Sequence, residues 1–239
     1  MQLTTIAKRL SAEVNQLSFE APVTHVYNPL DYAWAAHRRY LLNYGKAPKV
    51  GLLIGMNPGP FGMAQTGVPF GEVSLVRDWL GIEEKIGTPP DQHPKRPITG
   101  FACTRGEVSG NRLWSWAAQR YQTAERFHSK FFVWNFCPLV FMEESGRNRT
   151  PDKLPAAERD ALFDVCSDAL RRVIAQLKPQ HVVGIGRFAT DRASVVLGDD
   201  CPIQLTNAPH PSPANPAANR GWVPIFESAL RSAGVPFES

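Results

Sequence analysis

Three polar segments carry side chains that could take part in chemistry, and each follows a run of apolar residues. They are GMNPGPFG from Gly55, NFCPL from Asn135 and HPSPANPAANRGW from His210. An asparagine amide both donates and accepts hydrogen bonds, which suits it to reading the edge of a nucleobase. A histidine that opens a polar loop can transfer a proton or stabilise charge. These side chains are the candidates for a binding or catalytic site.

The first segment combines a stiff backbone with open space beside it. Asn57 precedes Pro58, which biases it toward an extended conformation, and Pro60 stiffens the loop further. Gly59 and Gly62 would let a ligand approach the backbone closely. Taken alone, the segment is equally compatible with a structural turn whose asparagine caps the next element.

The other two segments are ambiguous when each is taken singly. His210 follows an expected strand and heads a loop stiffened by prolines, which favours a chemical role, although a lone histidine is often a surface or core residue. Asn135 lies just beyond another expected strand, where asparagine is more often a turn residue. The other polar residues of the His210 loop are Ser212, Asn215, Asn219 and Arg220.

Apolar runs and amphipathic segments alternate along the chain. Buried strands are expected at 49–55, 130–136, 181–186 and from Ile203 onward. Helices are expected at 3–18, 31–44, 72–81, from Ser109, and at 154–177, 188–198 and 222–233. This alternation predicts an α/β fold with a parallel sheet between helical layers, and without a linker it predicts one domain over 1–239. In such a sheet ligands bind beyond the carboxyl ends of the strands, where the three polar segments lie.

Composition narrows the class of protein. The chain has 239 residues, a formal net charge of +4 and a pI of about 9.0, a mild indication of an anionic partner such as nucleic acid. The four cysteines include no CxxC pair, which favours free thiols over a zinc or iron–sulfur site. No signal peptide and no apolar run of about 18 residues is found, so a cytoplasmic protein without a membrane partner is expected.

Motifs for other chemistries are weaker. GIGRFA at 184–189 fits the dinucleotide fingerprint, but no clear acidic partner follows it, and close packing of a helix on a strand explains it as well. Ser212 lacks the G-x-S-x-G context of a hydrolase. The six histidines show neither HExxH nor HxH spacing, so neither a metal nor a cofactor is expected.

The three segments together, in this order and at these strand ends, resemble the single-strand-selective monofunctional uracil-DNA glycosylases of the uracil-DNA glycosylase superfamily. GMNPGPFGMAQTGVPFGEV at 55–73 is long and specific, and GFACTRGEVSGNRLW at 100–114, NFCPL and HPSPANPAANRGW match as well. The resemblance covers roughly residues 25–230. The N-terminal helix, at about 3–18, is less diagnostic.

This resemblance implies a three-layer α/β/α sandwich on a central four-stranded parallel sheet. It implies an enzyme of base excision repair that removes uracil and 5-substituted uracils, such as 5-hydroxymethyluracil, from DNA and leaves an abasic site. The implied partner is uracil-containing DNA, single- or double-stranded. Because repair of one base needs no symmetry, a monomer is expected, in the nucleoid of a bacterium or the nucleus of a eukaryote.

The resemblance also implies roles for the residues of the candidate site. Asn57 would hold the attacking water, and His210 would stabilise the anion that develops on uracil O2. The implied base-binding residues are Met56, Gly59, Phe70 and Asn135. Among them, Phe70 would stack on the flipped base, Asn135 would read its O4 and N3–H groups, and Gly59 would leave space beside C5.

The loop after His210 departs from the family at one position. It would fill the space vacated by the flipped base, and in the family it commonly reads HPSPRNP, with arginine where this chain has Ala214. A methyl group cannot plug that space as a guanidinium can, although Arg220 could partly serve. The wedge loop is assigned Pro211, Ser212, Pro213, Ala214, Asn215 and Arg220.

Two other classes of protein remain open at this point. A non-catalytic binder of damaged or single-stranded DNA could keep this fold, but it would need neither Asn57 nor His210. A dinucleotide enzyme built on GIGRFA would bind a nicotinamide cofactor.

Overall fold

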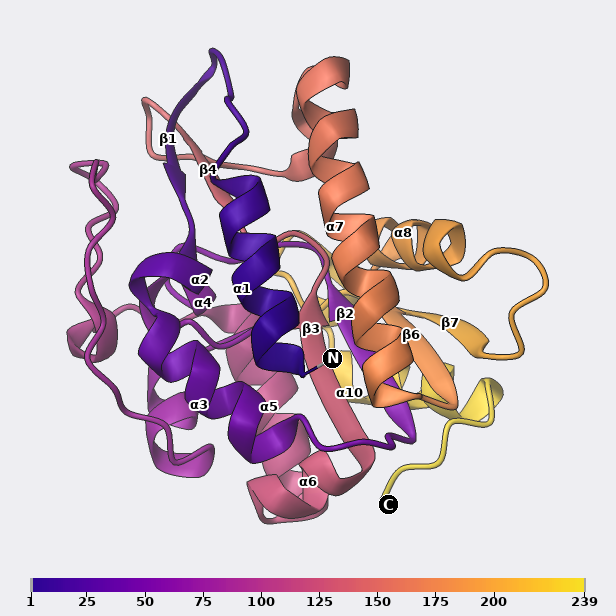
Figure 1. Ribbon diagram of the computed structural model, residues 1–239. Helices are drawn as coiled ribbons and strands as arrows, with labels where there is room; N and C mark the ends of the chain where they lie inside the picture. Colours follow the sequence, from indigo (N-terminus) through magenta and orange to yellow (C-terminus); the bar gives the residue numbers. More distant parts are fainter. Residues whose placement is uncertain (1, 239) are drawn as a thin grey trace.

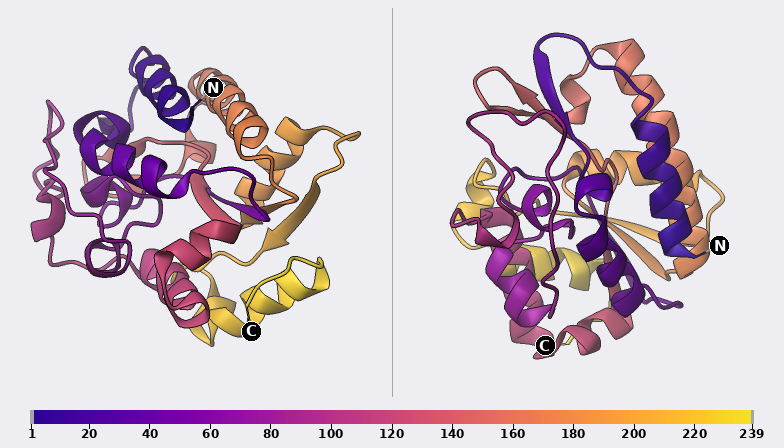
Figure 2. Two further views of the ribbon diagram at one scale, coloured as in Figure 1. Left: turned by 60° about the horizontal axis from the view of Figure 1, so that its bottom comes forward. Right: turned by 60° about the vertical axis from the view of Figure 1, so that its left-hand side comes forward.

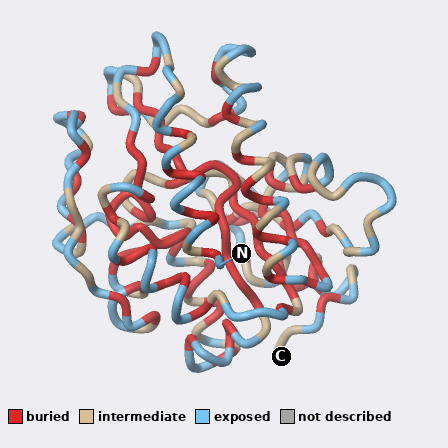
Figure 3. Tube along the Cα trace, in the orientation of Figure 1, coloured by how far each residue is buried: buried red, intermediate tan, exposed pale blue. Residues whose placement is uncertain are grey.

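A parallel sheet of four strands forms the centre of the fold (Figure 1). The computed structural model describes residues 2–238. The strands are β2 (Gly51–Gly55), β3 (Phe131–Asn135), β6 (His181–Ile185) and β7 (Gln204–Ala208), in the order β3-β2-β6-β7. All neighbouring pairs are parallel, and every residue of β2, β3 and β6 is buried, which explains their unbroken apolar runs (Figure 3). The predicted α/β fold is confirmed.

Helices cover both faces of this sheet (Figure 2). Packed together on one side are α1 (Leu3–Val14) and α7 (Ala156–Leu177), with α3 (Trp34–Tyr44) beside α1 and α8 (Arg187–Leu197) beside α7. On the other side lie α5 (Val108–Tyr121), α6 (Ala124–Lys130) and α10 (Trp222–Ser232). These are the three layers that the resemblance implied.

A second, antiparallel sheet was not predicted. It consists of β1 (Val23–Tyr27), β4 (Val140–Glu143) and β5 (Asn148–Arg149), in the order β1-β4-β5. The sequence gives little sign of it, because β5 has two residues and β4 is almost wholly buried, without the alternation of a half-exposed strand. The sheet matters for function, since it places the segment around Asn148 beside the loop that follows β2.

Several shorter elements also differ from expectation. The helix expected at 31–44 is divided at Ala33 into α2 (Pro29–Tyr32) and α3. The helix expected at 72–81 is a single π-helical turn, Leu75–Trp79. The remaining short helices are α4 (Met63–Thr66), α9 (Pro216–Asn219) and the 3₁₀ turns Gly100–Ala102 and Pro151–Lys153.

The GIGRFA motif packs a helix on a strand. A Cβ at Gly184 in β6 would lie 2.5 Å from the Cα of Thr190 in α8, so glycine is needed for this close approach. All four cysteines are free, with Cys137 and Cys166 buried and the other two half-buried. No helix within residues 2–238 is both long and apolar enough to cross a membrane.

The outer edge of β3 is covered by a side chain of α3. The hydroxyl of Tyr40 donates to the carbonyl oxygen of Val133 at 2.9 Å and accepts from the Val133 amide at 3.2 Å. Tyr40 is fully buried. Since β3 is an edge strand, one hydroxyl therefore satisfies both backbone groups that would otherwise have no partner there.

Tyr40→Phe should destabilise the protein by about 1–3 kcal/mol, because it leaves the buried Val133 amide and carbonyl unpaired. Urea unfolding followed by circular dichroism measures this loss. Tyr44→Phe is the matched comparison, since within residues 2–238 the Tyr44 hydroxyl makes a single hydrogen bond, to the carbonyl oxygen of Leu80 at 2.7 Å. Equal losses in both variants would show that the edge of β3 does not depend on the paired bond.

Candidate active site

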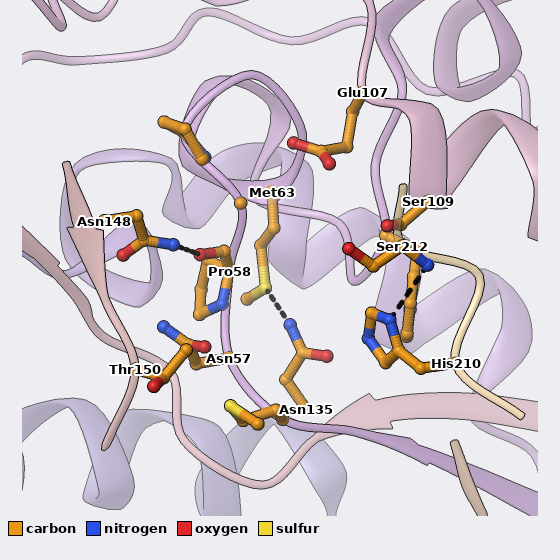
Figure 4. A pocket seen from close by; sticks show the side chains of 14 residues that line it. Asn57, Pro58, Met63, Glu107, Ser109, Asn135, Asn148, Thr150, His210 and Ser212 are labelled. Atoms are coloured by element: carbon orange, nitrogen blue, oxygen red, sulfur yellow. Dashed lines mark hydrogen bonds between the residues drawn. The ribbon is translucent and has the colours of Figure 1, made fainter. Parts of the chain in front are cut away.

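The loops that follow β2 and β7 meet the end of β3 at one pocket of about 330 Å³ (Figure 4). This volume lies at the lower end of the range for small-molecule sites and is large enough to admit a planar base. The pocket lies at the carboxyl edge of the parallel sheet, as the topology predicts. It is lined by Met56, Asn57, Pro58, Gly59, Pro60, Met63, Phe70, Glu107, Ser109, Asn135, Asn148, Thr150, His210 and Ser212.

The structure brings together the residues that were predicted to bind the base or to cleave its glycosidic bond. All residues given a catalytic or base-binding role line the pocket, as does Ser212 of the wedge loop. The rest of the wedge loop does not line it. Pro211 is buried, Asn215 is half-buried, and Pro213, Ala214 and Arg220 are exposed.

The amide of Asn57 has a defined orientation. Its Nδ2 donates to the carbonyl oxygen of Leu139 at 3.1 Å. This bond leaves Oδ1 without a partner among residues 2–238, on a residue that lines the pocket. The side chain can therefore accept a hydrogen bond from a water molecule there.

Asn135 is the last residue of β3 and is buried, and its side chain makes only a weak hydrogen bond among the residues that the structure describes. Its Nδ2 approaches the sulfur of Met63 at 3.3 Å, and sulfur is a poor acceptor. Asn135 pairs with Gly55 across the sheet, and a Cβ at Gly55 would overlap both the Asn135 amide and the ring of Phe70. A buried amide with so weak a partner can exchange it for the edge of a base.

Phe70 has a strained backbone, with φ of +53°. This conformation is uncommon for a bulky residue and is found where a site requires it. The carbonyl oxygen of Phe70 lies so close to α5 that a Cβ at Gly110 would overlap it. The ring of Phe70 is held 6.3 Å from that of His210, centroid to centroid, at the pocket wall.

The tautomer of His210 is set by its own loop. The backbone N–H of Ser212 donates to Nδ1 of His210 at 3.0 Å, so the proton of the neutral ring is on Nε2. Burial lowers the pKa of His210 to about 4. Near neutral pH the pocket thus contains a neutral imidazole with one N–H available to a ligand.

A network of hydrogen bonds holds the His210 loop. Nδ2 of Asn215 donates to the carbonyl oxygen of His210 at 3.0 Å. From α5, the guanidinium of Arg112 donates to the carbonyl oxygen of Pro211 at 2.8 Å and to Oδ1 of Asn219 at 3.1 Å. The loop is therefore fixed in place before any ligand binds.

Several residues of the pocket were not predicted. Glu107 and Ser109 lie within the 100–114 motif, which was matched as a whole without a role for either residue. Asn148 is the first residue of β5 and Thr150 directly follows this strand, and no pattern in the sequence marks them. Nδ2 of Asn148 donates to the carbonyl oxygen of Pro58 at 3.3 Å, so the small sheet supports the loop after β2.

Comparison with known proteins agrees with this arrangement. The profile of the uracil DNA glycosylase superfamily matches residues 42–229, which include all three loops. Proteins named single-strand selective monofunctional uracil-DNA glycosylase from Rattus norvegicus and Bos taurus are 48% identical over 228 residues. That alignment covers 95% of this chain and 82% and 84% of the two relatives. The chain belongs to the single-strand-selective monofunctional uracil-DNA glycosylase family.

A solved structure of low identity shares the fold of this glycosylase. The crystal structure of wild-type Pedobacter heparinus SMUG2 aligns with a TM-score of 0.65, over 95% of this chain and 96% of that one. The two sequences are 15% identical, so the likeness concerns the three-layer fold.

The ring of His210 in this glycosylase should titrate with a pKa near 4 and carry its proton on Nε2 at neutral pH. Burial disfavours the imidazolium, and the Ser212 amide occupies Nδ1. Nitrogen-15 and carbon-13 NMR of labelled histidine measures both properties, with His210→Gln used to assign the signal. A midpoint near 6.5, or a proton on Nδ1, would contradict this description.

Proposed function

We propose that the chain is a monofunctional DNA glycosylase of base excision repair, which hydrolyses the N-glycosidic bond of uracil and of 5-substituted uracils such as 5-hydroxymethyluracil. The product would be an abasic site in an intact strand. The observation that carries the proposal is the meeting of Asn57, Phe70, Asn135 and His210 at one pocket that is large enough to admit a base.

Recognition follows from the chemistry of the pocket walls. A base rotated out of the helix would stack on Phe70 and present O4 and N3–H to the amide of Asn135. The amide can rotate to donate to O4 through Nδ2 and to accept from N3–H through Oδ1. Leaving its weak contact with the sulfur of Met63 would cost little.

Cleavage would be driven by charge separation. As the bond between C1′ and N1 breaks, its electron pair goes to the base, and the sugar becomes an oxocarbenium ion. The N–H on Nε2 of His210 would stabilise the negative charge on O2, in a site that is already arranged. Water held by Oδ1 of Asn57 would then attack C1′, and the proton that it releases would pass to the uracil anion or to solvent. No lysine is among the fourteen residues that line the pocket, which supports hydrolysis without a Schiff base.

A non-catalytic binder of damaged DNA is the alternative, and one assay separates the two functions. The protein is incubated with an oligonucleotide that contains one uracil, and half of each sample is then treated with alkali. Strand breaks that appear only after alkali support a monofunctional glycosylase. Breaks without alkali would indicate lyase chemistry, and the absence of breaks would indicate a binder.

Asn57→Ala should lose most of the turnover and keep DNA binding, because it removes the water acceptor from a half-buried loop. His210→Ala should lower the single-turnover rate on the order of 10²–10³-fold, the usual effect of losing one oxyanion donor. Single-turnover kinetics on a uracil oligonucleotide and a binding titration measure the two effects. Near-normal rates in both variants would refute the assigned roles. The control is Asn43→Ala, which lies on the exposed surface of α3.

Contact with DNA would involve the exposed tip of the wedge loop. Ala214 is exposed at this tip, and Arg220 is exposed at the end of α9, where its guanidinium makes no hydrogen bond or ion pair with the described residues. A methyl group fills little of the space that a flipped base leaves in a duplex, whereas a single strand has no such space. We expect a monomer that acts on both forms of DNA, in the compartment that holds the genome.

Ala214→Arg should raise the excision of uracil from duplex DNA more than from a single strand, because only the duplex needs its gap filled. Paired single-turnover rates on the same uracil oligonucleotide, with and without its complement, measure the difference. Ala217→Arg, on α9 beyond the tip, controls for added charge. An equal change on both substrates would mean that position 214 does not act as a wedge.

A further inference from the structure

Four cationic side chains lie beside the pocket, and the mechanism above does not use them. Here called the basic surface, they are Lys95, Arg96, Arg105 and Arg147. Arg105 precedes Glu107 by two residues and Arg147 directly precedes Asn148, and both Glu107 and Asn148 line the pocket. In Figure 4 Asn148 and His210 lie at opposite sides of the cavity. The basic surface therefore adjoins the pocket at a different side from the wedge loop.

The ring of Phe61 gathers two of these guanidinium groups. Phe61 follows Pro60 of the pocket wall and is half-buried. The guanidinium carbon of Arg105 lies 3.9 Å from the centroid of the Phe61 ring, and that of Arg96 lies 5.5 Å from it. A guanidinium that stacks on an aromatic face keeps the N–H groups along its edge free to donate. Phe61 therefore orients arginine side chains without using their hydrogen-bond donors.

A buried tyrosine fixes the loop that carries Lys95 and Arg96. The hydroxyl of Tyr27 donates to the carbonyl oxygen of Arg96 at 2.8 Å and accepts from the backbone N–H of His93 at 2.8 Å. A Cβ at Gly146 would lie 3.3 Å from the Cβ of Lys95 and 3.4 Å from the guanidinium carbon of Arg96, so the turn at Gly146 packs directly on this loop. Segments far apart in the sequence thus form one surface, which is arranged before a ligand binds.

The positive charge of the basic surface has no partner within the protein. None of its four side chains forms an ion pair within residues 2–238. Of the carboxylates in the adjacent turn, Glu143 is paired with Arg149 at 2.9 Å and Glu144 is exposed to solvent. Within the same residues the guanidinium groups of Arg105 and Arg147 make no hydrogen bond either. Unpaired guanidinium groups suit a phosphate, which each can bind through two parallel N–H bonds.

We propose that the basic surface binds backbone phosphates of the uracil-containing strand next to the flipped nucleotide, on the side of the pocket away from the wedge loop. This inference rests on the proposed function, which places DNA across the mouth of the pocket. Because a single strand and a duplex carry the same phosphates, the contact serves both forms of DNA. It needs no gap in a base stack, so it supplies a hold on the strand that Ala214 cannot.

Arg105→Ala and Arg147→Ala test this contact through the salt dependence of binding. The probe is a fluorescent oligonucleotide with one tetrahydrofuran residue, a stable analogue of an abasic site, used as a single strand and as a duplex. Anisotropy measures its affinity from about 50 to 200 mM KCl. Each variant should bind both forms about fivefold to tenfold more weakly. The slope of log affinity against log salt should become shallower by about 0.7 on the single strand and about 0.9 on the duplex, because fewer counterions are released.

Lys46→Ala is the control for the loss of one positive charge. Lys46 is exposed and precedes β2, at the edge of the sheet opposite the pocket, so its removal leaves the basic surface intact. Affinities and salt slopes of Arg105→Ala and Arg147→Ala that equal those of Lys46→Ala would overturn this inference. The alkali assay on the wild type decides the proposed function separately, because it detects excision whichever cations hold the backbone.

Phe61→Leu tests whether the ring positions the guanidinium groups. The variant keeps every charge, so its salt slope should equal that of the wild type, while its affinity for both forms of DNA should fall about threefold because the arginines lose their stacking partner. An unchanged affinity would show that the ring does not orient the basic surface. An effect confined to the duplex would place Phe61 in a base stack and would also contradict the proposed role.

Discussion

The hydrogen bond from the Ser212 amide to Nδ1 of His210 is the interaction on which the chemistry of the pocket depends. It fixes the tautomer, and burial keeps the ring neutral, so the one N–H of the imidazole is available to the ligand. A neutral donor can approach a base without attracting the negatively charged DNA backbone into the site. It becomes most valuable as negative charge develops on the departing base.

The rest of the fold holds this donor and the opposing amides at fixed positions. The buried strands end at the same edge of the sheet, so Asn57, Asn135 and His210 come from separate segments of the chain to one pocket. Arg112 of α5 ties the His210 loop to the body of the protein. Gly55 leaves room for the ring of Phe70, and Gly110 leaves room for its strained backbone. A site arranged before the substrate binds loses little free energy to reorganisation.

The sequence was sufficient for the features that depend on local patterns. Unbroken apolar runs revealed β2, β3 and β6, because these strands are buried on both faces. The stiff polar loops at the ends of these strands indicated the residues of the candidate site. The antiparallel sheet was missed because its strands are short and do not alternate between apolar and polar residues. Glu107 was not singled out because its contact with Gly59 and Gly62, more than forty residues away, exists only in three dimensions.

The state of His210 is also the part of the account most open to direct test. The measurement is the single-turnover rate of uracil excision from pH 4 to pH 8, with saturating protein and constant ionic strength. Because the pKa of His210 is lowered to about 4, the rate should show no step from this residue above pH 5. It should fall as the pH approaches 4, where protonation of Nδ1 breaks the bond from Ser212. A step centred near 6.5 that disappears in His210→Gln would contradict the account, because the histidine would then act in its charged form.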